Sequence, residues 1–149
     1  MKFAPKSYNY LEDFLSKIQS QGRYAFALDE VKAEFSLSDK ALNQALYRFK
    51  TKKRIIQIRK EFYAILTPEF TESGIVPPAL FIDDLMNSLG KRYYIGLSSA
   101  VSIYNEAYPD QMQYYVITEK PALRAIVTKY IKINFYIKKE WNELDIIQI

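Results

Sequence analysis

The chain has 149 residues, 49% of them hydrophobic and 26% charged, which is enough to bury one medium core or two small ones. It contains no cysteine and no histidine, which excludes disulfides, thiol nucleophiles, zinc sites built on these residues and a histidine general base. Because an enzyme would have to work with carboxylates, Lys, Tyr or Ser alone, we expect a protein that is not an enzyme and holds no cofactor.

No apolar run approaches the roughly 18 to 20 residues needed to cross a bilayer, and the start, MKFAPKSYNY, lacks the apolar stretch of a secretory signal. We therefore expect a cytoplasmic protein with no membrane partner. The net charge of +4 is unevenly distributed: residues 1–66 hold 13 Lys or Arg and 7 Asp or Glu, whereas residues 67–149 hold 8 and 10. This difference in sign predicts two modules with different partners.

The first half predicts three helices and a hairpin in a fixed order. Helix-forming periodicity and the breaker Gly22 delimit the first helix, with Ser7 as its cap, and Ser38 is the predicted N-cap of the third helix. β-branched and aromatic residues on both sides of a short connection predict the hairpin. The expected elements are a helix over 8–21, a strand over 23–28, a helix over 29–35, a helix over 39–51, and strands over 55–58 and 62–66 joined by Arg59-Lys60-Glu61.

The second half predicts a small mixed module. Residues 67–78 hold three of the six prolines and no basic residue, which is typical of a linker. The expected elements are a helix over 79–89 that Gly90 ends, a helix over 97–106, a strand over 114–118, a helix from Pro121 to Lys129, a strand over 131–138 and a strand over 144–149. The predicted fold class is α+β: a winged helix-turn-helix over 1–68, a linker over 69–78 and an α+β domain over 79–149.

The predicted third helix has two faces. Leu42, Ala45, Leu46 and Phe49 form an apolar stripe, and polar side chains lie opposite. From residue 48 to residue 60 the chain carries seven basic residues and no acidic one. In a winged helix these positions meet phosphates while the helix enters the major groove.

Base-edge contacts are expected from the polar side of this helix, because Asn and Gln pair with adenine and Arg pairs with guanine. Two readings remain open: the basic run is either a phosphate-binding surface or a solvated one, and Tyr47 either contacts DNA or packs on the helix stripe. The candidate DNA-binding residues are Ser38, Lys40, Asn43, Gln44, Tyr47, Arg48, Lys50, Thr51, Lys52, Lys53, Arg54, Arg59 and Lys60.

The second half carries no metal-ligand cluster, phosphate-binding glycine loop or catalytic triad. Asp83 and Asp84 are adjacent, but successive helical residues point about 100° apart, so they favour an exposed helix face over a catalytic site. A regulatory or interaction domain is the interpretation that remains. An alternative is that the winged helix contacts protein, or that the chain regulates transcription without any other activity.

Several segments resemble the AbiEi-family antitoxins of type IV toxin–antitoxin systems. In the second half these are YYIGLSSAVSIYN, YYVIT followed by Glu119-Lys120-Pro121, and INFYIKK, within residues 80–141. In the first half, LDEVKAEFSLSDKALNQAL and EFYAIL look like the winged-helix domain of that family. The resemblance covers nearly the whole chain and rests on domain order and short segments.

The resemblance implies a concrete biology. Such antitoxins bind inverted repeats in their own promoter and repress it, and their C-terminal domain counters a nucleotidyltransferase-like toxin without a stable complex between the two. These systems act in phage defence by abortive infection. Family members continue with further strands and a helix containing a Pro-Glu-Leu-Thr-like segment, so the C-terminal domain here is expected to be truncated or abbreviated at Ile149.

Overall fold

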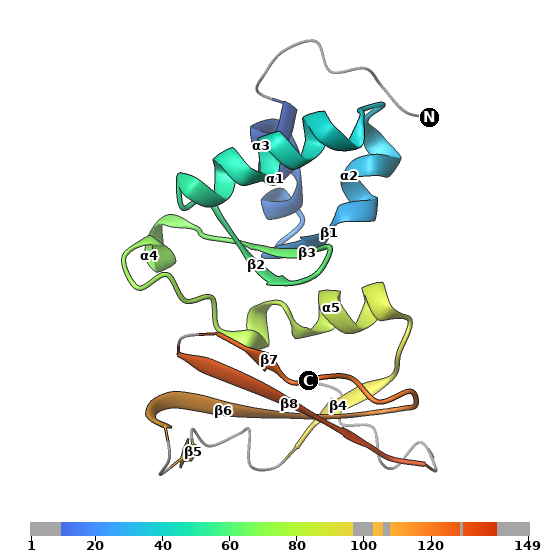
Figure 1. Ribbon diagram of the computed structural model, residues 1–149, viewed down its shortest axis with the longest axis vertical. Helices are drawn as coiled ribbons and strands as arrows, with labels where there is room; N and C mark the ends of the chain where they lie inside the picture. Colours follow the sequence, from blue (N-terminus) through green and yellow to red (C-terminus); the bar gives the residue numbers. More distant parts are fainter. Residues whose placement is uncertain (1–9, 97–102, 106–107, 129, 140–149) are drawn as a thin grey trace. The chain divides into compact units, whose positions relative to one another are not determined.

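The computed structural model describes residues 10–96, 103–105, 108–128 and 130–139. The fold is mixed α+β, with two small β-sheets, and the chain forms two compact units, Met1–Leu85 and Met86–Ile149 (Figure 1). In the described part of the chain, no helix is both long enough and apolar enough to cross a membrane.

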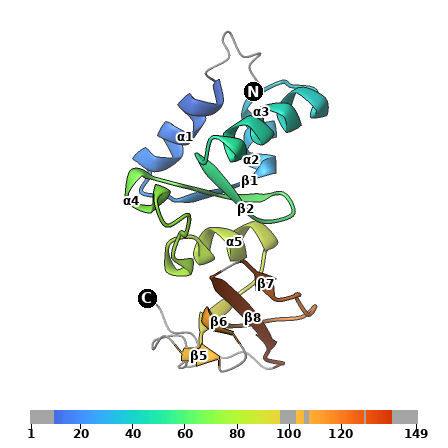
Figure 2. The ribbon, with the colours of Figure 1, turned by 60° about the vertical axis from the view of Figure 1, so that its left-hand side comes forward.

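The first unit consists of helices and one three-stranded antiparallel sheet of order β1-β3-β2. In Figures 1 and 2 its first three helices lie on one face of this sheet. Its elements are α1 (Tyr10–Ser20), β1 (Ala25–Ala27), α2 (Leu28–Glu34), α3 (Asp39–Thr51), β2 (Ile55–Arg59), β3 (Phe62–Ile65), α4 (Pro68–Thr71) and a 3₁₀ helix, η1 (Pro78–Leu80). The first unit ends at Leu85, within the next helix, α5 (Ile82–Leu89).

The core of the first unit follows from helical and strand periodicity. The apolar residues of α1 recur every three or four positions and are all buried, and α3 buries its own stripe against the sheet. Phe26 of β1 is fully buried, edge-on to Phe14 and stacked on Tyr63. Gly22 ends α1 in the left-handed region (φ +74°), which a glycine adopts without a steric penalty.

The helix α3 begins and ends where the sequence predicts. The Oγ of Ser38 accepts a hydrogen bond of 3.1 Å from the backbone N–H of Ala41, so Ser38 is the N-cap. The stripe residues Leu42, Ala45 and Leu46 are buried, and Phe49 is partly buried against the same core.

Replacing Ser38 with alanine is expected to lower the free energy of unfolding by about 1 kcal/mol, because the N–H of Ala41 loses its acceptor. Urea denaturation monitored by far-UV circular dichroism measures this loss. Ser36→Ala, in the same exposed turn, is the matched control and is expected to change stability by less than about 0.5 kcal/mol. Equal losses in the two variants would contradict the capping role.

The second unit is built on a five-stranded sheet whose main path has the order β4-β6-β8-β7. The neighbours β6 and β8 run parallel, with Val116 opposite Phe135, and the other pairs are antiparallel. Val116, Thr118, Ile131 and Ile133 are buried on one face of this sheet. Its strands are β4 (Tyr93–Ile95), β5 (Ile103–Asn105), β6 (Tyr108–Thr118), β7 (Ile126–Val127) and β8 (Ile131–Ile137).

The predicted elements of this unit divide into three groups. The strands expected at 114–118 and 131–138 and the helix that ends before Gly90 are confirmed. The helix expected from Pro121 to Lys129 is wrong, because Ile126 and Val127 pair with β8. The helix expected over 97–106 is wrong at Ile103–Asn105, which form β5 against β6; its other residues, together with Ser7 and the strand expected at 144–149, lie outside the described residues.

The division between the units differs in position from the linker expected at 69–78. That stretch contains most of α4, belongs to the first unit and buries Val76. The division between Leu85 and Met86 also changes the charge comparison. Residues 1–85 hold 13 basic and 11 acidic residues and residues 86–149 hold 8 and 6, so both units have a net charge of +2.

Candidate nucleic-acid interface

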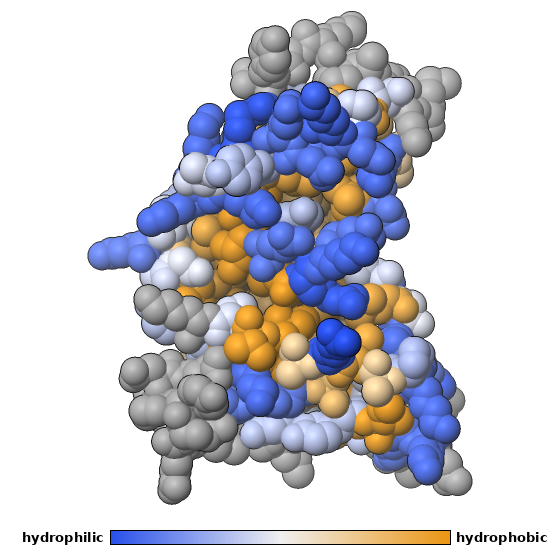
Figure 3. Space-filling view, in the orientation of Figure 1, coloured by the Kyte–Doolittle hydropathy of each residue, from blue (hydrophilic) through white to orange (hydrophobic). Residues whose placement is uncertain are grey.

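The outer face of α3 is polar and exposed to solvent. Tyr47 is 67% exposed at the middle of this face. The interpretation that Tyr47 packs on the apolar stripe of the helix is therefore wrong. Figure 3 shows hydrophilic residues along the outer side of the first unit over α3. The exposed candidates on and around this helix are Ser38, Lys40, Asn43, Gln44, Tyr47, Arg48 and Thr51, followed by Lys52 and Lys53 after its end.

The β2–β3 hairpin lies beside α3, and Gln57 connects the two. Its Oε1 accepts a hydrogen bond of 3.3 Å from Nζ of Lys50, the second-last residue of α3. Gln57 also lines a shallow hollow together with Asn43 and Lys60. The structure therefore brings together residues from the helix and the hairpin that are 7 to 17 positions apart, and Gln57 extends the predicted surface. Its position between two isoleucines of a strand is the sequence signal that could have indicated it.

The tip of the hairpin is less positive than the sequence suggested. Arg59 is the last residue of β2 and is half-buried, so the turn consists of Lys60 and Glu61, one charge of each sign. The backbone carbonyl of Glu61 accepts a hydrogen bond of 2.9 Å from the N–H of Leu28, which fixes the tip to the start of α2. The hairpin is thus short and attached to the unit.

Arg54 has a different position from the other basic candidates. Its guanidinium forms an ion pair and hydrogen bonds with the carboxylate of Glu12 on α1, 42 residues earlier in the chain. It is half-buried there, whereas Lys52 and Lys53 are exposed. The geometry therefore assigns Arg54 to the packing of α1 against the turn after α3, and it is not part of the exposed basic surface.

The remaining basic side chains lie near the two ends of α3. Lys50, Lys52 and Lys53 are at its C-terminal end, whereas Lys60 shares a hollow with Asp39 and Asn43, near the N-terminal end. A helix of 13 residues is about 18 Å long at a rise of about 1.5 Å per residue. The basic side chains of this surface are therefore not one cluster but lie toward both ends of the helix.

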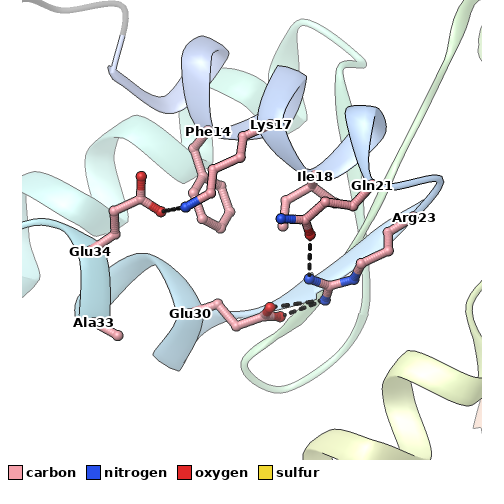
Figure 4. Close-up of a pocket in the computed structure, with 8 residues that line it drawn as sticks. All are labelled: Phe14, Lys17, Ile18, Gln21, Arg23, Glu30, Ala33 and Glu34. Atoms are coloured by element: carbon pink, nitrogen blue, oxygen red, sulfur yellow. Dashed lines mark hydrogen bonds and ion pairs between the residues drawn. The ribbon is translucent and has the colours of Figure 1, made fainter.

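A second hollow in the first unit, of about 470 Å³, lies between α1 and α2 (Figure 4). Its charged side chains point toward one another: Lys17 Nζ is 2.9 Å from Glu34 Oε2, and Arg23 Nη2 is 2.9 Å from Glu30 Oε1. These pairs join α1 and the chain after it to α2. We assign this hollow to packing between the two helices, since its charges already have partners.

The adjacent carboxylates Asp83 and Asp84 do not act as a pair. Asp83 is exposed, whereas Asp84 is half-buried and accepts a hydrogen bond of 3.1 Å from Arg23 Nε. Burial raises the pKa of the Asp84 carboxyl, and the Arg23 guanidinium counteracts part of this rise. Within the described ranges, no three acidic side chains come together in a way that could hold a metal ion. The geometry of Asp83 and Asp84 therefore does not support the hypothesis of an enzyme that uses these two carboxylates.

The comparisons with known proteins give no relative for this chain: no protein-family model, no curated protein and no solved structure matches it.

Proposed function

We propose that the first unit is a winged helix-turn-helix that binds double-stranded DNA, with α3 in the major groove. The order α1-β1-α2-α3-β2-β3 and the sheet order β1-β3-β2 support this proposal. The observation that carries it is the exposed polar face of α3, which has basic side chains at both of its ends.

In this proposal the residues have two roles. Asn43, Gln44 and Arg48 lie on the exposed side of α3 and contact base edges, with Tyr47 beside them. Lys50, Lys52, Lys53 and Lys60 contact phosphates and contribute affinity without reading the sequence. Arg59 is half-buried at the end of β2 and lies at the margin of this surface.

Binding of the full chain to duplex DNA from its own upstream region tests this proposal. Fluorescence anisotropy is expected to give a Kd about 10³-fold or more below that for random duplex of the same length. The logarithm of the affinity should fall with the logarithm of the salt concentration with a slope of about −4, as expected for four or five phosphate contacts. Asn43→Ala should lower the preference for the upstream DNA and leave binding to random duplex unchanged. Equal affinity for both duplexes, or a slope near zero, would contradict the proposal.

We further propose that the chain represses its own promoter at inverted repeats and counters a nucleotidyltransferase-like toxin. The support is the resemblance of YYIGLSSAVSIYN, YYVIT and INFYIKK to AbiEi-family antitoxins. Co-expression of the chain with a toxin encoded next to it is expected to restore growth. A variant that no longer binds DNA should restore growth equally, because the antitoxin role belongs to the second half. Continued growth arrest with the unaltered chain would exclude this role.

A further inference from the structure

One face of the second unit's sheet carries aromatic and basic side chains. Residues that pair directly across strands share a face, and side chains alternate along each strand. Because Val116, Thr118 and Ile133 are buried on one face, the residues that alternate with them lie on the other face. We call this the tyrosine face; its members are Tyr94, Gln113, Tyr115, Ile117, Val127, Lys132, Asn134 and Tyr136.

The tyrosines of this face lie on three neighbouring strands. Tyr94 of β4 is opposite Ile117 of β6, and Ile117 is opposite Tyr136 of β8, so the three form one row across the sheet. Tyr115 is in the next row, and its ring stacks on that of Tyr136 with centroids 6.0 Å apart and an angle of 19° between the planes. Tyr136 is 54% exposed and Val127, at the edge of the same face, is 63% exposed.

Polar and basic groups adjoin these rings. Asn134 Nδ2 donates a hydrogen bond of 3.0 Å to Gln113 Oε1, which places two amides next to Tyr115; Gln113 itself is buried. Lys132, opposite Gln113, is partly buried, and Lys138 Nζ lies 5.6 Å from the centre of the Tyr94 ring. A sheet face of this kind differs from an ordinary apolar docking surface, because rings, amides and cations alternate on it.

The basic side chains beside the rings favour a partner of negative charge. Lys132 belongs to the tyrosine face, and Lys138 Nζ lies close to the Tyr94 ring. Residues 86–149 as a whole hold eight Lys or Arg and six Asp or Glu. One of these carboxylates, that of Glu119, accepts hydrogen bonds from the backbone N–H of Arg92 at 2.8 Å and from its Nη2 at 3.0 Å, so its negative charge is balanced locally.

We propose that the tyrosine face binds single-stranded nucleic acid, with bases stacked on the tyrosine rings and Lys132 and Lys138 beside the phosphates. Stacking on aromatic rings joined to a basic surface is the chemistry by which proteins hold single strands without reading their sequence. RNA and single-stranded DNA both offer this chemistry. This site is separate from the proposed duplex-binding surface of α3, and it does not depend on that proposal.

The experiment uses the full chain and two fluorescein-labelled probes, a 12-nucleotide oligo(U) RNA and a 12-nucleotide oligo(dT) DNA, at low salt. Both probes are expected to bind, and tighter binding of one identifies the natural ligand as RNA or DNA. Tyr136→Ala should weaken binding by about tenfold or more, because one base loses its stacking partner. Tyr136→Phe, which keeps the ring, should bind as the unaltered chain does. If Tyr136→Ala fails to fold by circular dichroism, Lys132→Gln replaces it and should lower the salt slope by about 0.7.

The control variant is Lys52→Glu/Lys53→Glu, which changes the surface at the end of α3. It should leave the affinity for both single strands unchanged. Loss of single-strand binding in this variant, with full binding retained in Tyr136→Ala, would assign the binding to the first unit and overturn the proposal. Failure of both probes to bind the unaltered chain at low salt would also overturn it.

Discussion

Replacing Phe26 with alanine is expected to lower the free energy of unfolding of the first unit by about 3 to 5 kcal/mol. The ring is fully buried and lies between Phe14, at 5.3 Å between centroids, and Tyr63, at 5.6 Å. Its removal loses the transfer free energy of the ring and leaves a cavity that β1 cannot close, because β1 is held in register against β3. Urea denaturation followed at 222 nm measures the loss, since α1 and α3, the two longest described helices, belong to this unit.

Tyr47→Ala is the matched control for the Phe26 variant. It also removes an aromatic ring, but from the exposed face of α3, and is expected to change stability by less than about 0.5 kcal/mol. A loss below about 1 kcal/mol in Phe26→Ala would show that the stacked rings do not form the centre of this core.

Reversing two charges, in Lys52→Glu/Lys53→Glu, is expected to weaken binding to duplex DNA by at least about 30-fold at 0.15 M salt. Each phosphate contact contributes about 0.9 to the salt slope, so two lost contacts account for about this factor at that concentration, and repulsion adds to it. The slope itself should become shallower by about 2. Fluorescence anisotropy over a salt series measures both quantities.

Arg54 is left unchanged in this variant, because its ion pair with Glu12 would mix folding with binding. The matched control is Lys120→Glu/Arg124→Glu, which makes the same change in net charge at exposed positions of the second unit. It should retain duplex affinity. If Lys52→Glu/Lys53→Glu also retains the affinity for duplex DNA, the exposed lysines after α3 do not bind phosphates. The first unit is then better described as a protein-interaction module.

The elements that local chemistry determines could be predicted from the sequence. The bounds of α3 follow from the Ser38 cap and from a stripe of apolar residues, and the hairpin follows from two β-branched runs around a short turn. The exposed positions of Asn43, Gln44 and Tyr47 follow from the same periodicity. These features depend on residues within one or two turns of each other.

What the sequence did not indicate depends on residues far apart in the chain. Arg54 belongs to a basic run by sequence, but Glu12 on α1 removes it from the exposed surface. Ile126 and Val127 follow a proline that suits the start of a helix, yet pairing with Ile133 and Lys132 makes them a strand. Tertiary pairing overrides local propensity in short segments of this kind.

The burial of Val76 bears on how the chain can be cut into parts. A fragment that ends at residue 68, where proline content suggests a joint, would lose this side chain as well as Phe81 and Ile82, which are also buried. It would also lose Asp84, and with it one of the two carboxylates that hold Arg23. Such a fragment should melt at a lower temperature than one extended through Leu85. Weak DNA binding by the shorter fragment would then reflect unfolding of the first unit.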